Sequence, residues 1–556
     1  MKRHLRGQLS ARTEPDAGEE TPPTDRLRVE AEGDFARARI YPRLEDNEAW
    51  LKKVLGAPSD LVIRRCRTRA GGDAAGRQAL ICYLEGMADP GAVADALVRA
   101  LAFEAAMLAT GTRKSGDGQT AEVPLIVHTG SVTWVNEWAQ VLHGVLSGDT
   151  VIFLEGQAKA LVCGTRGFET RGIEEPGLES TLKGTREGFV ESASVNLTLI
   201  RRWVKSPRLR VRRLILGDLT NLRVEVLHVE GLAGRELVEE LYARLERIKL
   251  EDPLGSNAIA EFISDSPASP LPMVMATERP DRAAGALLNG RVVILVENTP
   301  FALIAPSDLG LVLTSAEDYY VNPLFAFLNR ILRLTGLFTT LLAPALYVAL
   351  TTFHTEMLPT AFFLRLQAAR EGVPLPSVAE AILMGATFEL LREAGLRMPR
   401  QVGQAISVVG ALVIGEAAVR AGVISPIMLV VLGITAIAGF SVPGYVALLS
   451  MWLPRLVYTL LAGALGLFGV AAGAMVTMYY TLSLRSFGVP FAFPYLPSTL
   501  SDFKDMVVRA PWWAMVRRPS QLARGEPMRM PRPQPPHPPY PPPPPRTRSL
   551  GKKGKR

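Results

Sequence analysis

The hydrophobic pattern divides this chain into two parts near residue 330. Long apolar runs occur only in the C-terminal part, at 335–353, 402–419, 423–442 and 456–484. A helix of about 20 apolar residues is long enough to cross the hydrocarbon core of a bilayer. The pattern therefore predicts an all-α polytopic membrane domain at 331–486, with about four spans, behind a large soluble region.

One further stretch of the membrane domain is helical in pattern but too charged to span. Residues 378–395 carry Glu380, Glu389 and Arg392 among apolar positions. An amphipathic helix of this kind lies in the membrane interface or packs across the helix bundle. A topology with more than four crossings, or one in which 360–395 dips into the bilayer, also remains open.

The soluble region alternates short β-type runs with amphipathic helical stretches, which is typical of an α/β fold. Residues 79–100 parallel 224–245, and 147–165 parallel 289–307 at nearly the same spacing. Two matches at a common spacing predict an α/β cytosolic region of two similar tandem subdomains, at 47–180 and 211–330. Chance similarity between amphipathic segments is the alternative.

A helix is expected between these two subdomains, over 182–205. Phe189, Leu197 and Ile200 recur there at helical spacing and give the segment one apolar face. We assign it to a connecting segment at 181–210.

The two ends of the chain differ in composition from the rest. Residues 1–46 are charged and rich in Pro and Gly, and residues 525–556 form a Pro-rich basic tail. Both compositions predict disorder, and the tail favours extended polyproline II conformation. The tail is either a solvated, variable end or a ligand for a partner or a lipid surface. A juxtamembrane cytosolic segment at 487–524 joins it to the membrane domain.

The charge balance bears on topology and partners. The formal net charge is +8, and basic residues beside a membrane domain favour the cytoplasmic face and anionic membrane lipids. No apolar stretch follows Lys2, Arg3 and Arg6, so no cleavable signal peptide is predicted and both termini are expected in the cytosol. No nucleic acid is expected as a partner, because no basic helix or aromatic platform accompanies the charge.

The chain lacks the residue patterns of the common catalytic and metal sites. Its three cysteines show no CxxC spacing, and its six histidines are scattered. No GxxxxGK[ST], HExxH or GxSxG sequence occurs. We therefore predict neither an enzyme, nor a cofactor, nor a metal site.

Glu416 is the sharpest candidate residue in the membrane domain. It lies in an otherwise apolar run, and a charge at bilayer depth costs at least ~2.5 kcal/mol. It is either a pore or gating carboxylate, or the i,i+4 ion-pair partner of Arg420 near the membrane surface.

Several long segments resemble one protein family. They include TLKGTREGFVESASVNLTLIRRWVKSPRL, MVMATERPDRAAGALLNGRVVILVENTPFALIAP, SAEDYY, VGALVIGEAAVRAGVISP, and SLRSFGVPFAFPYLP followed by RAPWW. They occur in family order between about residues 50 and 520. The chain resembles the GerA-type spore germination proteins, specifically the A subunits of nutrient germinant receptors, to which the SpoVAF-type proteins are related.

This resemblance implies a function and a setting. The protein is expected in the spore inner membrane as a multi-pass subunit that self-associates, as a pentamer, around a germinant-gated pore for monovalent cations. A transporter-like B subunit and a lipoprotein C subunit are the implied partners. Charged and polar positions in the matched segments are candidates for interface or signalling networks, or for ordinary fold-stabilising contacts: Arg186, Glu187, Asn196, Glu278, Arg279 and Asp281.

Two alternative functions are weighed against a channel subunit. One is a scaffold whose membrane domain conducts nothing. The other is a secondary solute transporter, which is disfavoured because four spans are few and no inverted repeat of broken helices is visible in the membrane part.

Overall fold

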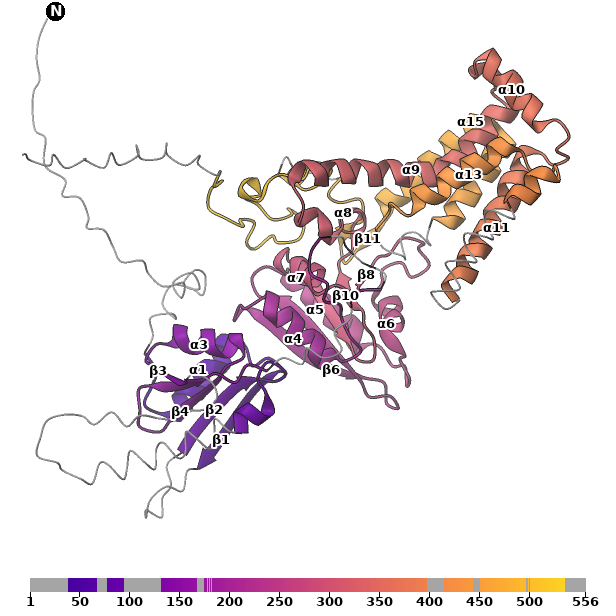
Figure 1. Ribbon diagram of the computed structural model, residues 1–556. Helices are drawn as coiled ribbons and strands as arrows, with labels where there is room; N and C mark the ends of the chain where they lie inside the picture. Colours follow the sequence, from indigo (N-terminus) through magenta and orange to yellow (C-terminus); the bar gives the residue numbers. More distant parts are fainter. Residues whose placement is uncertain are drawn as a thin grey trace, which may run out of the picture. The chain divides into compact units, whose positions relative to one another are not determined.

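The computed structural model describes residues 39–67, 78–94, 132–167, 175–177, 179, 181, 183–397, 415–443, 451–496, 499 and 501–535 (Figure 1). The chain forms two compact units, Met1–Glu169 with Lys205–Arg208 and Thr170–Val204 with Leu209–Arg556. Residues 1–38 and 536–556, for which disorder is predicted, lie outside the described residues, as does most of the second predicted span at 402–419.

The first unit contains a five-stranded antiparallel sheet with the strand order β1-β2-β4-β5-β3. Helices α1 (Leu44–Leu55) and α3 (Trp138–Ser147) cover one face of it, where the rings of Trp50 and Trp138 stack with their centroids 3.8 Å apart. The strands are β1 (Leu61–Arg67), β2 (Gln78–Leu84), β3 (Val132–Val135), β4 (Thr150–Leu154) and β5 (Ala160–Cys163).

The second unit begins with another five-stranded antiparallel sheet, in the order β6-β7-β9-β10-β8. Its strands are β6 (Leu209–Leu216), β7 (Leu222–Val229), β8 (Met275–Thr277), β9 (Val292–Val296) and β10 (Ala302–Ala305). One apolar core joins the sheet to α4 (Ala193–Trp203) and α7 (Pro280–Leu288), and a second joins it to α5 (Arg235–Glu246) and α6 (Gly255–Ile263). Helices therefore cover both faces of this sheet.

The two sheets correspond strand for strand in their order. A glycine with positive φ follows the helix before the central hairpin in each, Gly148 at +93° and Gly290 at +87°. A Cβ atom there would lie 2.7 Å from the Met87 carbonyl oxygen in the first sheet and 2.8 Å from that of Leu232 in the second. Both positions therefore require glycine for the same two reasons, backbone conformation and close approach.

The helix predicted over 182–205 is shorter, because α4 begins at Ala193. Phe189 and Val190 precede it in extended chain. The Asn196 side chain fixes that chain, since its Oδ1 accepts from the Val190 N–H at 2.8 Å and its Nδ2 donates to the Val190 carbonyl at 2.6 Å. The helix packs on α7, β7 and β9, so it belongs to the second α/β layer instead of connecting two subdomains.

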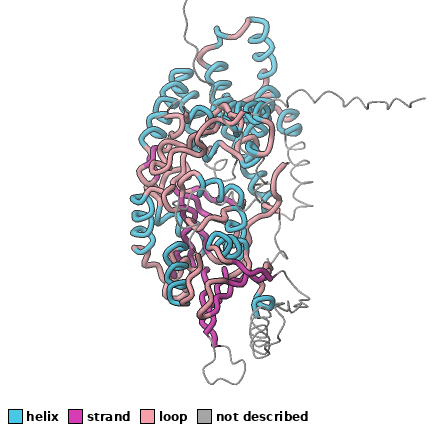
Figure 2. The backbone as a smooth tube through the Cα atoms, turned by 90° about the vertical axis from the view of Figure 1, so that its left-hand side faces the viewer, coloured by secondary structure: helices cyan, strands magenta, loops and turns pink. Residues whose placement is uncertain are grey.

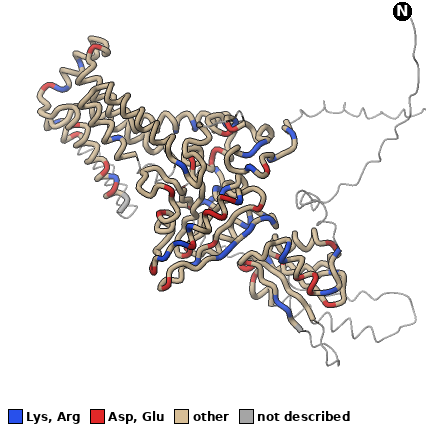
Figure 3. The backbone as a smooth tube through the Cα atoms, turned by 180° about the vertical axis from the view of Figure 1, so that it is seen from behind, with Lys and Arg blue, Asp and Glu red and all other residues tan. Residues whose placement is uncertain are grey.

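A helical region follows, built from α9 (Pro323–Thr352), α10 (Thr360–Arg370), α11 (Ser377–Arg397), α13 (Pro426–Gly439) and α15 (Trp452–Ser483). Among the described residues, α9 and α15 qualify as candidate spans by length along the sequence and by composition, and α13 is a shorter apolar helix. Figure 3 shows that charged residues are sparse along this bundle and gather at its ends and on α11. The number of spans stays a prediction.

Helix α15 is two helical arms joined by a reversal at Gly466, where φ is 64° and ψ is −143°. The Tyr458 hydroxyl lies 3.0 Å from the Thr477 hydroxyl. In a straight helix these residues would be about 28 Å apart along the axis. The single span predicted over 456–484 is therefore a hairpin, with arms about 21 and 25 Å long.

Side-chain contacts give the direction of each bundle helix. Helix α13 runs antiparallel to α9, because Thr340 bonds to the Thr435 carbonyl at 3.4 Å and Tyr347 lies 3.4 Å from Ser425, hydroxyl to hydroxyl. The α15 reversal packs against Phe353, at the C-terminal end of α9. The start of α9 and the end of α15 consequently lie at the same end of the bundle.

Helix α11 packs lengthwise on this bundle, in contact with α9, α13 and α15. Its first residue, Ser377, lies 3.2 Å from Thr351 near the end of α9, hydroxyl to hydroxyl, and Glu389 pairs with Arg455 near the start of α15. The placement of 378–395 relative to the bilayer stays a prediction. Glu380 on the first turns of α11 is fully buried.

The chain then returns to the second α/β layer. The hairpin of β11 (Arg485–Ser486) and β12 (Val489–Pro490) follows α15, and Ser486 donates a hydrogen bond to the Met273 carbonyl at 2.6 Å. These strands and the two sheets are magenta in Figure 2. Short 3-10 and α turns complete the described elements: α8 (Leu309–Leu313), η3 (Ala316–Tyr319), η4 (Thr355–Met357), η5 (Asp502–Lys504) and η6 (Trp512–Ala514).

The first part of the predicted tail is held by hydrogen bonds. Arg529 donates to the Asn289 side chain at 2.6 Å, and the Gln534 N–H donates to the Trp513 carbonyl at 3.1 Å. Residues 525–535 therefore pack on the second unit, although their composition predicts disorder.

We expect Gly466→Ala to lower the midpoint of thermal unfolding of the purified protein. The φ and ψ angles at this position suit glycine alone, at a cost of about 1–3 kcal/mol for another residue, and a Cβ would lie 2.7 Å from the His354 ring. Gly433→Ala on α13 is the control, because its Cβ would meet nothing within 4 Å. Equal midpoints for the two variants would contradict a reversal at Gly466.

Candidate functional site

Arg279 joins two of the sequence segments singled out above. Its side chain is buried, and all five guanidinium N–H groups have acceptors. Nε and Nη2 form a fork on the Asp281 carboxylate at 3.0 and 2.7 Å. Nη1 donates to the Glu179 carbonyl and the Thr181 hydroxyl, at 3.2 and 2.9 Å, and Nη2 also donates to the Thr185 carbonyl at 3.2 Å. One cation therefore holds the 179–185 chain against the start of α7.

Gly184 allows this close approach. Its φ is +139°, and a Cβ would lie 3.0 Å from the Tyr320 ring and 3.4 Å from Arg279 Nη2. A side chain at this position would separate the two segments that Arg279 connects.

The other predicted residues lie in the same region of the second unit, and Arg186 differs from them in being exposed. Glu187 pairs with Arg202 at 3.1 Å, and the Glu278 carbonyl accepts from the Phe189 N–H at 2.7 Å. Asn196 fixes the chain before α4, as described above. In this single chain, the contacts of Asn196, Arg279 and Asp281 lie within one unit and stabilise its fold.

The network continues from Asp281 into the SAEDYY segment. The Tyr320 hydroxyl donates to the Asp281 carboxylate at 2.9 Å. Burial, followed by the neighbouring Asp281 carboxylate, raises the pKa of Tyr320 above its ordinary value, so the hydroxyl stays protonated. A capping box between Ser315 and Asp318 sets the turn of η3 that carries this tyrosine.

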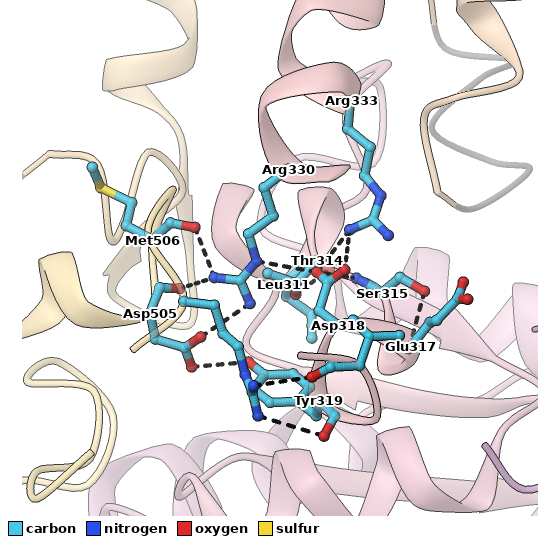
Figure 4. A network of polar contacts seen from close by, with 12 residues as sticks. Leu311, Thr314, Ser315, Glu317, Asp318, Tyr319, Arg330, Arg333, Asp505 and Met506 are labelled. Carbon is cyan, nitrogen blue, oxygen red and sulfur yellow. Dashed lines mark hydrogen bonds and ion pairs between the residues drawn. The ribbon is translucent and has the colours of Figure 1, made fainter. Parts of the chain in front are cut away.

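Asp318 connects this turn to the first apolar helix (Figure 4). Its fully buried carboxylate accepts from Arg330 Nε at 3.1 Å and from Arg333 Nη1 at 2.7 Å, and both arginines point from α9 towards it. Three residues apart on a helix, the two side chains project from the same face.

The same arginine reaches the chain that follows the bundle. Arg330 donates to the Asp505 carboxylate at 3.0 Å and to the Asp505 and Met506 carbonyls at 3.0 and 2.9 Å. The Tyr319 hydroxyl donates to Asp505 at 2.8 Å, and burial, followed by this carboxylate, raises the pKa of Tyr319. We call this set (Asp318, Tyr319, Arg330, Arg333 and Asp505) the junction. It ties the α/β layer, the start of α9 and the C-terminal segment together.

Sequence reasoning missed the junction, although it contained a signal. In the sequence, Arg330 and Arg333 stand out only as basic residues beside the membrane domain, a pattern that bears on topology alone. Their spacing on one helix face, with Asp318 shortly before them, could have indicated a buried pair. Asp505 lies too far along the chain to be recognised as the third member.

A second buried polar cluster lies in the bundle. The Glu380 carboxylate accepts from the Ser425 N–H and hydroxyl at 3.3 and 2.9 Å and pairs with Arg370 at 3.3 Å. Further along α11, Glu389 pairs with Arg455 at 2.6 Å. Glu380 is therefore a carboxylate enclosed by the bundle. The sequence pattern identified it only as one charge of an amphipathic helix.

Glu416, the predicted candidate of the membrane domain, lies elsewhere. It pairs with Arg420 at 2.5 Å, four residues on, and more than half of its side chain is exposed. Within the described ranges, no group of three or more His, Cys, Asp or Glu residues has the geometry to hold a metal ion.

We expect Arg279→Met to destabilise the fold by about 3–5 kcal/mol, because it leaves the buried Asp281 carboxylate without its cation. Thermal unfolding of the purified protein measures this effect. Arg235→Met is the matched control, since Arg235 is exposed and its i,i+4 pair with Glu239 is screened by solvent, so its loss should leave the unfolding midpoint almost unchanged. Similar unfolding of the two variants would exclude an organising role for Arg279.

Comparison with known proteins gives the family. The model of the Bacillus/Clostridium GerA spore germination protein family matches residues 49–521. The chain is 38% identical to spore germination protein KA of Bacillus subtilis, over 89% of this chain and 90% of the relative, and 34% identical to spore germination protein GerLA of Bacillus cereus, over 85% and 94%. The crystal structure of the N-terminal domain of the A subunit of the Bacillus megaterium germinant receptor GerK3 aligns with 49% of this chain and 97% of its own, at 28% identity and a TM-score of 0.36. The resemblance noted in the sequence is thus confirmed, and the chain belongs to the GerA family of spore germination proteins.

Proposed function

We propose that this protein is the A subunit of a nutrient germinant receptor and that it helps to form a germinant-gated channel for monovalent cations. The family match over 49–521 supports the germination role. The bundle of apolar helices, with small residues at close helix contacts such as Gly463 against Val378, supports a membrane domain whose helices associate with one another.

The junction is the observation that carries the signalling part of this proposal. A receptor subunit must transmit a change in its soluble region to its membrane helices. Asp318 and Asp505 both hold Arg330, just before the first apolar run begins. A displacement of the SAEDYY turn would therefore act directly on the start of α9, with no flexible linker between them.

The proposed assembly follows the family. The subunit is placed in the spore inner membrane with both termini in the cytosol, in contact with anionic lipids. It self-associates, as a pentamer, and works with a transporter-like B subunit and a lipoprotein C subunit. The common end of the bundle at which α9 begins and α15 ends supports termini on one side of the membrane.

A non-conducting scaffold is the alternative function, and a secondary solute transporter is less well supported. Potassium flux through liposomes that contain the purified protein, with and without its partner subunits, separates them. We expect cation flux that depends on the germinant in the complete receptor. If well-folded oligomers pass no cations under any condition, the scaffold function is the one that remains, and a partner subunit conducts the cations.

Asp505→Asn should uncouple the signal while the protein still folds. Its carboxylate is one-third exposed, so losing its charge disturbs the fold less than a change at the fully buried Asp318. We expect slower germinant-triggered potassium release from spores at normal receptor abundance. Glu230→Gln, which removes one charge of an exposed ion pair, is the control. Unchanged release in Asp505→Asn spores would remove the junction from the signalling route.

Glu416 stays our candidate pore or gating carboxylate, and its ion pair with Arg420 supplies the control. If Glu416 attracts cations to a pore, Glu416→Gln lowers the preference for potassium over chloride in liposome recordings, whereas Arg420→Gln does not. If the two residues form only a surface pair, both variants conduct like the parent protein.

A further inference from the structure

The second unit contains a half-open groove with a volume of about 790 Å³, bounded by α7, η3 and the C-terminal segment. Aromatic rings from four separate parts of the chain line it: Trp203, Tyr319, Tyr320, Phe493 and Trp512. The proposed function uses two residues of its wall, Tyr319 and Asp505, but assigns no occupant to the groove.

Two of these rings are unusually exposed for tryptophan. Trp203, at the end of α4, is 45% exposed, and Trp512 is 49% exposed. Within the described residues, neither indole N–H has a hydrogen-bond acceptor. Exposed indole rings with free N–H donors are the features with which proline-recognition domains hold polyproline II segments, since the rings pack against prolines and the N–H donates to their carbonyls.

The charges in the groove do not favour a small anion as the occupant. Arg291 pairs with Asp308, and Arg282 pairs with Glu179 at 2.5 Å. Arg518 donates to three backbone carbonyls, those of Leu288, Glu526 and Met528. These three guanidinium groups already have acceptors and therefore offer no free anion site. Lys504 and Arg517 also line the groove, but most of its lining surface is apolar.

The chain itself leads a proline-rich segment to this groove. Arg529 lines it and lies over the Trp512 ring at 5.6 Å. The described chain continues to residue 535, next to Trp513, and the sequence PPYPPPPP follows at 538–545. A polyproline II segment rises about 3.1 Å per residue, so these residues extend about 25 Å, enough to run through the groove from its edge.

We propose that residues 538–545 of this same chain dock in the groove as a polyproline II segment, between Trp203 and Trp512. The tail is then an internal ligand that covers the aromatic face of the second unit. Tyr319 and Asp505 belong both to the groove and to the junction, so an occupied groove presses on the residues that hold α9.

Peptide binding to the full membrane protein in detergent tests this proposal. The probe is a fluorescein-labelled peptide of residues 533–550, and the two proteins are the complete chain and a chain ending at Pro535. We expect the peptide to bind the shortened chain. Its affinity for the complete chain should be at least about tenfold lower, because the tethered tail competes for the groove at high effective concentration. A peptide with alanine at 541–545 should not bind.

Three substitutions in the shortened chain locate the site. Trp203→Ala should weaken binding about tenfold or more. Gly285→Phe fills the groove from α7, at a position where a Cβ meets nothing within 4 Å, and should block the peptide with little effect on the fold. Trp513→Ala is the control, because that ring is also exposed but does not line the groove.

Each contrary result overturns the proposal. Equal binding to the parent, Trp203→Ala and Gly285→Phe proteins would place the peptide elsewhere. Equal binding to the complete and shortened chains would show that the tail does not occupy the groove. Binding lost at about 1 M salt, where the Debye length is about 3 Å, would assign it to the basic residues of the peptide.

Discussion

The second unit depends on buried arginines, above all Arg279 and Arg330, whose charge is paired with a carboxylate and whose hydrogen-bond donors mostly find protein acceptors. A buried guanidinium is costly unless its charge and its donors are satisfied together. Arg279 donates hydrogen bonds to a segment about a hundred residues before it in the sequence. Arg330, which precedes the bundle, donates to the chain that follows the bundle. Loops that have few apolar residues of their own acquire fixed positions in this way. Packing of the sheets supplies most of the burial, but the arginines determine which loops meet.

This arrangement explains why the polar residues of the matched segments are not independent sites. Asp281 binds Arg279 and Tyr320 at once, and Tyr320 directly follows Asp318 and Tyr319, the residues of this turn that belong to the junction. A chemical event in the soluble layer thus has a short path of charged contacts to the membrane helices. Coupling through a contiguous network requires two arrangements of its parts, and the partly exposed Asp505 is the member with the most freedom to move.

The sequence was sufficient where local pattern decides structure. The hairpins of β4 with β5 and β9 with β10, the helix after Glu230 and the apolar character of α9 all follow from periodicity. Prediction from the sequence failed where a contact or a backbone conformation outside the hydrophobic pattern determines the local structure. Asn196 keeps residues 189–190 out of a helix that their spacing favours, and the backbone freedom of Gly466 turns one apolar run into two arms. Of the site, the Arg279 and Asp281 segment was recognised through family resemblance, whereas Asp505 could be assigned only in three dimensions.

In the membrane topology proposed above, the reversal at Gly466 also bears on how the chain enters the bilayer during synthesis. Each arm of α15 is shorter than the roughly 30 Å of a hydrocarbon core, so neither is a complete signal for insertion alone. A one-residue turn leaves no polar loop to be carried across. The two arms must therefore partition into the lipid together, as one paired unit, after α9 has provided the surface at Phe353 and His354 against which their tip rests.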